Sequence, residues 1–256
     1  MSKRVLAIAA HPDDIEFVMA GTLLQLVSRG WQAYYFCIAN GCCGSNQTGQ
    51  AETAETRLEE AKRAADAIPA VHYRPLRNDL EIFYDNSTHR EVTAVVRQCQ
   101  PSIILTHALS DYMEDHQNTA RLAVGAAFAR GMKNFESEPA VDPYDSEVAI
   151  YHAQPHGNRD PLGNLVVPRV FVDVTQIMSK KTELLGMHES QAAWLDESQK
   201  MNSYIQTMVD LNKEVGHLSN KFAFAEGWTQ HIHLGLSSEN FNPLCDALAS
   251  DVHSAT

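Results

Sequence analysis

Residues 4–16 read RVLAIAAHPDDIE, and this stretch decides the fold. Its first half is a continuous apolar run with the length of a strand that is buried on both faces of a sheet. The run ends at His11, Pro12, Asp13 and Asp14, so an imidazole and two carboxylates follow the strand's carboxyl end. Open α/β sheets bind their ligands at the carboxyl ends of strands. The stretch therefore predicts a buried strand with a divalent-cation site beside it.

The rest of the chain repeats the order strand, then helix. Strands are predicted at residues 4–10, 32–39, 72–76, 102–107, 148–152 and 169–174, and helices at 18–28, 51–67, 90–100 and 117–130. Strands that alternate with helices of this length form a parallel sheet with right-handed crossovers. The sequence therefore predicts a Rossmann-like three-layer α/β/α sandwich with a mostly parallel sheet, built by a single domain over residues 1–256.

The C-terminal half is less regular. Residues 136–168 hold five of the ten prolines and indicate long loops around one short strand, which either shape a substrate pocket or only connect elements. Residues 174–215 have a helical pattern, broken near 188–194, that either covers the sheet or forms an oligomer contact. Residues 222–236 end the pattern as an extended segment.

The chemistry of a catalytic zinc ion assigns different roles to the two carboxylates. Such an ion takes three protein ligands and a water, and a nearby base must accept the water's proton. If His11 and Asp14 hold the ion, Asp13 is left as that base. A third ligand is expected from another strand end, and His116 follows the strand at 102–107. The alternative is that the Asp pair only caps a helix.

At these residues the sequence resembles the PIG-L/LmbE-like N-deacetylase family, zinc enzymes that remove acetyl groups from N-acetylglucosamine-type sugars. The resemblance covers most of the chain. Its motifs, in order, are HPDDIE at 11–16, AGT at 20–22, NGCCGS at 40–45, RLEE at 57–60, DH at 115–116, VDVT at 172–175 with Lys181, and HESQ at 188–191. The resemblance implies that His11, Asp14 and His116 bind zinc and that Asp13 is the general base.

One motif departs from the family. Many relatives carry a histidine that can stabilise the oxyanion and protonate the leaving amine, but this chain has Met113 at that position, and methionine donates no proton. Another acid is needed, and we predict His188, because the corresponding segment faces the cleft in some family members. The alternative is that His188 is a surface or helix-capping residue. Other histidines that could replace it are His89, His107, His231 and His233.

Substrate binding is predicted less sharply. Arg57 is the predicted sugar-binding residue, because its family counterpart faces the pocket. The alternative is an exposed helix arginine paired with Glu60, at an i,i+3 spacing that favours such pairs. Aromatic side chains that could stack on a sugar ring are Tyr112, Tyr144 and Trp228.

The composition is that of an ordinary folded protein with an excess of acidic residues. The formal charge of -12 argues against nucleic acid or an anionic membrane as a partner, and favours a neutral or cationic small substrate. No apolar stretch approaches the roughly 18 residues of a membrane span. The apolar run before His11 is too brief for a signal peptide. We therefore expect a cytoplasmic protein, and leave open whether it is a homo-oligomer.

The cysteines indicate no disulfide framework, because they are odd in number and lack C-x-x-C spacing. They are Cys37, Cys42, Cys43, Cys99 and Cys245. Cys37 lies in a strand pattern and is expected in the core. Cys42 and Cys43 lie in a loop expected near the metal, where they are either two small loop residues or a ligand or redox pair.

Together, the residues and the resemblance predict a zinc-dependent hydrolase that removes an N-acetyl group from an N-acetylglucosamine-type sugar or sugar conjugate. The native metal could instead be Fe²⁺. Two histidines and a carboxylate also suit non-haem iron oxygenases, but those usually adopt a β-barrel, which the strand–helix alternation contradicts. Two alternatives remain: a sugar- or metal-binding protein without catalysis, and a hydrolase of another amide, such as a thiol-sugar conjugate.

Overall fold

The computed structural model describes residues 2–192, 194 and 204–254. Within this part of the chain, one sheet has the strand order β3-β2-β1-β4-β5-β7-β6-β8. The strands are β1 (Arg4–Ala9), β2 (Gln32–Cys37), β3 (Ala70–Tyr73), β4 (Ile103–Thr106), β5 (Ala149–Ala153), β6 (Val170–Asp173), β7 (Ala225–Gln230) and β8 (Val252–Ser254). The helices are α1 (Asp14–Val18), α2 (Ala20–Ser28), α3 (Gln50–Ala67), α4 (Asn86–Cys99), α5 (Glu114–Ala129), α6 (Met178–Leu185), α8 (Tyr204–Leu218) and α9 (Pro243–Leu248), with short 3₁₀ turns at His156–Asn158 and Thr175–Ile177.

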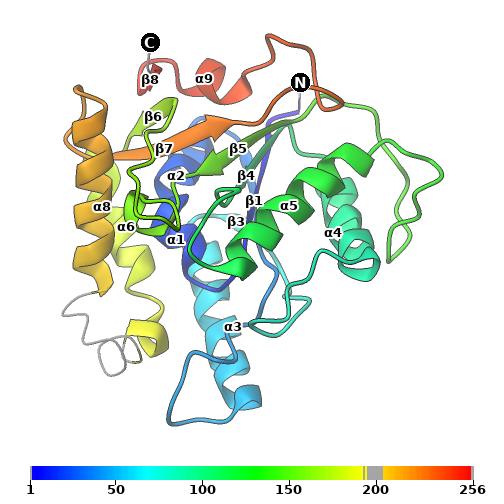
Figure 1. Ribbon diagram of the computed structural model, residues 1–256, viewed down its shortest axis with the longest axis horizontal. Coiled ribbons are helices and arrows are strands. Elements are labelled where there is room, and N and C mark those ends of the chain that lie inside the picture. The colour runs from blue at the N-terminus through cyan, green and yellow to red at the C-terminus, as the bar shows by residue number, and fades with distance from the viewer. Residues whose placement is uncertain (1, 193, 195–203, 255–256) are drawn as a thin grey trace.

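Helices cover both faces of the sheet (Figure 1). Alternate residues of β1 belong to different hydrophobic clusters. Val5 and Ala7 share one with residues of α1, α2, α3, α6, α8 and α9, whereas Leu6 and Ile8 share the other with residues of α4 and α5. All four side chains are fully buried, as expected for a central strand with helices on both faces. The predicted three-layer α/β/α sandwich is confirmed.

The sheet is mostly parallel, also as predicted. Strands β3, β2, β1, β4 and β5 pair in parallel, so their carboxyl ends meet at one edge and the loops that follow them meet there too. The remaining strands, β7, β6 and β8, extend the sheet with antiparallel pairs. The parallel part therefore places the site, and the antiparallel part widens the sheet beyond it.

Several element boundaries differ from the prediction. β3 lies at Ala70–Tyr73 and not at 72–76, and the pattern did not reveal α9 or β8. Helix α4 begins at Asn86, four residues early, because the Asp85 carboxylate accepts a hydrogen bond from the backbone N–H of Thr88 at 2.8 Å and caps it.

The helical pattern at 174–215 forms α6 and α8, and residues 193 and 195–203 of that segment lie outside the described residues. Helix α5 begins at Glu114, so His116 lies in its first turn and not in the loop before it. Among the described residues, no helix has both the length and the apolar character needed to span a membrane.

Candidate metal site and cavity

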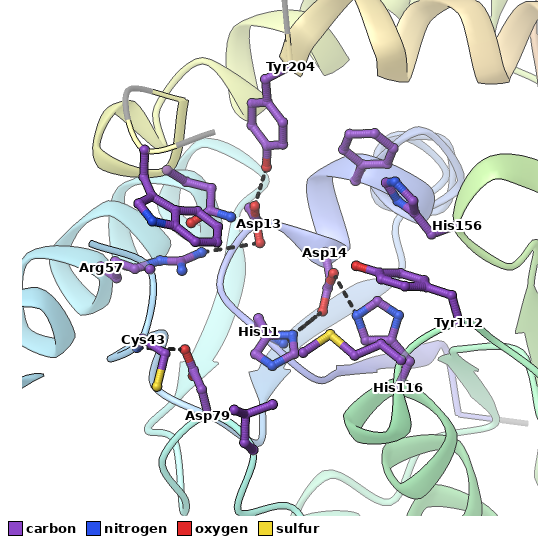
Figure 2. A pocket seen from close by; sticks show the side chains of 16 residues that line it. His11, Asp13, Asp14, Cys43, Arg57, Asp79, Tyr112, His116, His156 and Tyr204 are labelled. Atoms are coloured by element: carbon purple, nitrogen blue, oxygen red, sulfur yellow. Dashed lines mark hydrogen bonds and ion pairs between the residues drawn. The ribbon is translucent and has the colours of Figure 1, made fainter. Parts of the chain in front are cut away.

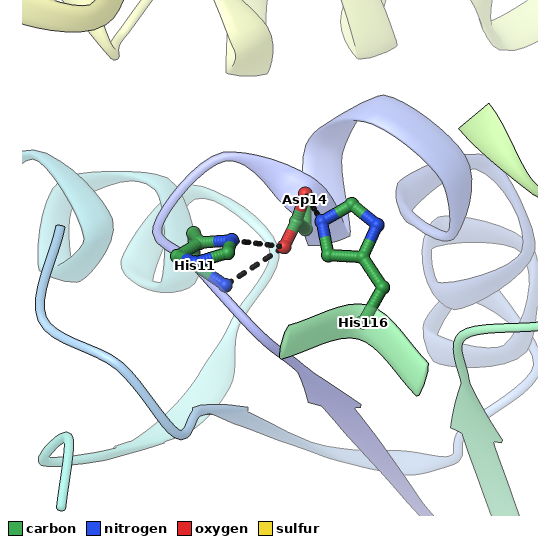
Figure 3. A group of neighbouring side chains, drawn as sticks. All are labelled: His11, Asp14 and His116. Atoms are coloured by element: carbon green, nitrogen blue, oxygen red, sulfur yellow. Dashed lines mark hydrogen bonds and ion pairs between the residues drawn. The ribbon is translucent and has the colours of Figure 1, made fainter. Parts of the chain in front are cut away.

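His11, Asp14 and His116 come together at the carboxyl edge of the parallel strands (Figure 3). His11 follows β1, Asp14 opens α1, and His116 lies in the first turn of α5 after β4. The Nδ1 atom of His11 lies 3.4 Å from the Oδ2 atom of Asp14, and the Nε2 atom of His116 lies 3.5 Å from Oδ1. The structure thus brings the three predicted ligands into one cluster.

Each histidine of the cluster is held by a second carboxylate. The Nε2–H group of His11 donates to Asp115 at 3.0 Å, and the Nδ1–H group of His116 donates to Asp111 at 3.0 Å. A carboxylate only accepts, so each far ring nitrogen carries a proton, and the nitrogen facing Asp14 is the one that a metal ion would take. Carboxylates support metal-binding histidines in this way. The sequence reasoning did not assign these roles to Asp111 and Asp115.

The geometry and charge of this cluster fit a divalent cation. Nitrogen and oxygen ligands on a tetrahedral zinc ion lie about 3.3 Å apart, close to the two separations between Asp14 and the histidines. Burial alone lowers the pKa of His11, but the hydrogen bonds that its ring donates to the Asp115 and Asp14 carboxylates raise this pKa to about 10. The site therefore stabilises positive charge. Two imidazoles and a carboxylate suit Zn²⁺ and Fe²⁺ equally as ligand types.

Asp13 lies beside this cluster with its carboxylate turned toward other partners (Figure 2). One oxygen lies 3.3 Å from the Arg57 guanidinium and the other accepts a hydrogen bond from the Tyr204 hydroxyl. Its backbone has a φ of 101°, a left-handed conformation that costs a non-glycine residue energy and is typical of functional sites. Burial raises the pKa of Asp13, although Arg57 opposes this effect.

Arg57 is buried, with a side chain only 3% exposed. Its guanidinium donates to the backbone oxygen of Pro12 at 2.6 Å in addition to contacting Asp13. The alternative of an exposed arginine paired with Glu60 is wrong, because Glu60 accepts hydrogen bonds from the backbone and hydroxyl of Ser190. Arg57 lines the cavity, but its nearest partners are the turn and the carboxylate of the HPDD motif.

The cluster opens into a cavity of about 460 Å³, a size typical of small-molecule sites. It is lined by His11, Asp13, Asp14, Phe17, Cys43, Gly44, Arg57, Asp79, Leu80, Tyr112, Met113, His116, His156, Gln191, Trp194 and Tyr204. Of the predicted aromatic platforms, only Tyr112 is among these residues. Trp228 is a core residue whose ring N–H donates to Thr22, and Tyr144 packs against the core cluster that includes residues of α4 and α5.

Four cavity residues with polar groups were not predicted from the sequence: Asp79, His156, Trp194 and Tyr204. His156 begins the turn after β5, and its ring centre lies 5.1 Å from that of Phe17 and 5.3 Å from that of Tyr112. Burial lowers the pKa of His156. A histidine at the end of a parallel strand was the available signal.

His188 lies outside the cavity lining and is fully buried. Its Nε2 atom lies 3.0 Å from the carboxylate of Glu16, which also accepts a hydrogen bond from Tyr35. Its position gives no support to the predicted role as proton donor. Of the other candidates, His107 stacks on His116 with ring centres 4.1 Å apart; it does not line the cavity, and neither do His89, His231 and His233.

We expect His188→Leu to lower the free energy of unfolding by about 3 kcal/mol, because it leaves a buried carboxylate without its imidazole partner. Turnover of the folded, metal-loaded protein should stay within about tenfold, since general acid–base residues contribute about 100-fold or more. Denaturant unfolding and kcat measured on one sample check this. Unchanged stability with a 100-fold loss of kcat would restore His188 as the acid.

The chain resembles known deacetylases in sequence and structure. It is 28% identical over 199 residues to the diacetylchitobiose deacetylase of Thermococcus kodakarensis, covering 74% of this chain and 70% of that protein. The N,N'-diacetylchitobiose deacetylase from Pyrococcus horikoshii, solved with its inhibitor MPG, superposes with a TM-score of 0.76 at 24% identity, covering 95% of this chain and 89% of that one.

The fold alone does not identify the reaction. GalB, the 4-carboxy-2-hydroxymuconate hydratase from Pseudomonas putida KT2440, superposes with a TM-score of 0.73 at 20% identity, over 90% of this chain and 96% of that one. The family comparison is more specific. Residues 6–127, which include the HPDD motif and both histidines of the cluster, match the family described as PIG-L, GlcNAc-PI de-N-acetylase. Over these residues the chain resembles the PIG-L family, as its sequence motifs predicted.

Proposed function

We propose that this protein hydrolyses the N-acetyl group of an N-acetylglucosamine-type sugar or sugar conjugate, using Zn²⁺ held by His11, Asp14 and His116. The observation that carries the proposal is the His–Asp–His cluster with a separate buried carboxylate, Asp13, beside it in a sugar-sized cavity. The names of the relatives support the reaction class. Because the cavity takes residues from His11 to Tyr204, we propose that the chain acts as one domain.

When bound, the metal ion would supply an acidic water and a polarised acyl carbonyl. Asp13 accepts the water's proton: its pKa is raised by burial, and contacts from Arg57 and Tyr204 hold its carboxylate in place. The same carboxylic acid then returns the proton to the departing amine as the carbon–nitrogen bond breaks. The products are acetate and a primary amine.

We assign His156 the role of donor to the developing oxyanion. It lines the cavity, and burial lowers its pKa, so its neutral imidazole offers an N–H group without adding positive charge near the cation. Burial raises the pKa of Tyr112, which makes that hydroxyl a poor acid. This arrangement needs no proton donor at position 113, where the chain has methionine.

His156→Phe should lower kcat by about 100-fold, the usual cost of removing one oxyanion donor, while metal content stays unchanged. Phenylalanine keeps a ring against Phe17 but removes both nitrogens. Tyr112→Phe is the matched control, and should retain kcat within a few-fold. Equal losses in the two variants would instead indicate a general effect of altering the cavity wall.

The charge of the site favours an uncharged sugar. Five carboxylates line the cavity or support its histidines: Asp13, Asp14, Asp79, Asp111 and Asp115. Their negative charges outnumber the positive charges of Arg57 and a divalent ion. The Arg57 guanidinium is already engaged by Asp13 and Pro12. An anionic group on the substrate would meet a negative site.

The test is a panel of N-acetylated sugars, with release of primary amine measured and metal content determined on the same sample. We expect activity on N,N'-diacetylchitobiose and at least a roughly tenfold lower kcat/KM for N-acetylglucosamine 6-phosphate, a loss of about 1.4 kcal/mol of transition-state stabilisation. Binding of these sugars by zinc-loaded protein without amine release would favour a non-catalytic sugar-binding protein.

A further inference from the structure

Two thiols and a carboxylate gather at the rim of the cavity, apart from the His–Asp–His cluster. The Sγ atoms of Cys42 and Cys43 lie 3.9 Å apart. Together with a carboxylate oxygen of Asp79, they place three donor atoms within 4.8 Å of one another. Cys42 is buried and Cys43 is exposed, and Figure 2 shows Cys43 beside Asp79 on the cavity wall.

The loop that carries the thiols is fixed by hydrogen bonds. The Asp79 carboxylate accepts from the backbone N–H groups of Gly41 at 2.7 Å and Cys43 at 2.9 Å, and Asn40 accepts from that of Cys42 at 3.1 Å. Gly41 has a φ of +77°, and a Cβ atom there would lie 2.6 Å from the Arg57 side chain, so the turn requires glycine. The three donor groups are therefore held together in advance.

We propose that Cys42, Cys43 and Asp79 form a second cation site, selective for soft divalent ions of the Zn²⁺ and Cd²⁺ class. Two thiolates bound to a tetrahedral zinc ion at about 2.3 Å are about 3.8 Å apart, and these sulfur atoms are already 3.9 Å apart. Asp79 supplies the third ligand and water the fourth. Binding releases the two thiol protons, and the thiolates select against hard ions such as Mg²⁺.

A disulfide between the two cysteines is the competing use of this pair. Neighbouring Cα atoms are about 3.8 Å apart across a trans peptide. The usual Cα–Cα distance in disulfides begins at about 4.4 Å, which is longer. Such a bond would be strained, whereas one shared ion requires almost no movement of the sulfur atoms. The geometry therefore favours the ion.

The rim site adjoins the metal cluster without sharing a ligand. Leu80, next to Asp79, donates its backbone N–H to Asp115 at 2.7 Å, and Asp115 in turn accepts from His11. An ion at the rim would therefore lie on the cavity wall. Its ligand Asp79 is next in sequence to Leu80, which donates to the carboxylate that supports His11.

The test is a titration of the full-length, zinc-loaded, reduced protein with Cd²⁺, following thiolate-to-cadmium absorption in the ultraviolet. We expect the band to saturate at one Cd²⁺ per chain. Cys43→Ser, a change at an exposed residue, should weaken binding at least about 100-fold, and Cys42→Ser/Cys43→Ser should abolish the band. Cys245→Ser is the control, because Cys245 lies in α9 outside the cavity lining, and it should leave the titration unchanged.

Persistence of the band in the double variant would overturn the proposal, and so would its absence from a reduced protein with five titratable thiols. A thiol count of three in the protein as isolated, with reduction failing to restore Cd²⁺ binding, would assign the pair to a disulfide instead. Thermal unfolding of Cys43→Ser, of the double variant and of Cys245→Ser checks that each titrated protein is folded.

Discussion

Asp13→Asn is expected to remove nearly all deacetylation, about 1,000-fold or more in kcat, while the protein keeps its metal. The amide cannot accept the proton that the carboxylate takes from water. The side chain contacts Arg57 and Tyr204 and is not in the His–Asp–His cluster, so the ion should stay bound. Asparagine also tolerates the left-handed backbone that this position requires, so the turn should keep its backbone conformation.

The measurement is kcat for N,N'-diacetylchitobiose together with metal content by elemental analysis. Asp66→Asn, at an exposed position of α3, is the control for removing one negative charge and should behave as the parent protein does. Loss of metal together with activity in Asp13→Asn would make Asp13 a ligand and contradict its assignment as base.

His116→Ala should give the opposite combination, in which the metal itself is lost. The change removes one of three ligands and leaves Asp111 without the imidazole that it holds at 3.0 Å. Removing a supporting carboxylate alone typically costs 10–100-fold in metal affinity, so loss of a direct ligand should exceed about 100-fold, and activity should fall with it.

Equilibrium dialysis against limiting Zn²⁺ measures this affinity. His217→Ala, an exposed histidine of α8, should bind as the parent protein does. With Cys42 and Cys43 both changed to serine, so that only the His–Asp–His cluster is measured, stoichiometric zinc in His116→Ala at the same free concentration would exclude His116 from the metal site.

The strand–loop logic of a parallel sheet explains why much of the site could be predicted. A long apolar run identifies β1, and the polar residues after it must lie at the sheet's carboxyl edge. His116 follows β4, the strand that pairs with β1, so the two loops meet. The same rule points to His156, which follows β5. This residue was not predicted, because it lies in a proline-rich segment and the chain has many other histidines.

Other contacts depend on the tertiary structure and leave no local signal. His188 pairs with Glu16 across 172 residues, and a helical pattern does not show which of its residues will be buried. Tyr204 reaches Asp13 from the first residue of α8 across a similar separation. The antiparallel pairs of β6, β7 and β8 also escaped prediction, because strand–helix alternation alone indicates parallel strands.

Zinc restoration tests the central claim most directly. The protein is freed of metal with a chelator and returned to buffer, and amine release from N,N'-diacetylchitobiose is followed as Zn²⁺ is added. We predict that the metal-free protein is inactive, and that in Cys42→Ser/Cys43→Ser, which keeps only the His–Asp–His cluster, activity rises to a plateau at one equivalent of zinc per chain. Metal-free protein that deacetylates at the rate of the zinc-loaded protein would contradict the account.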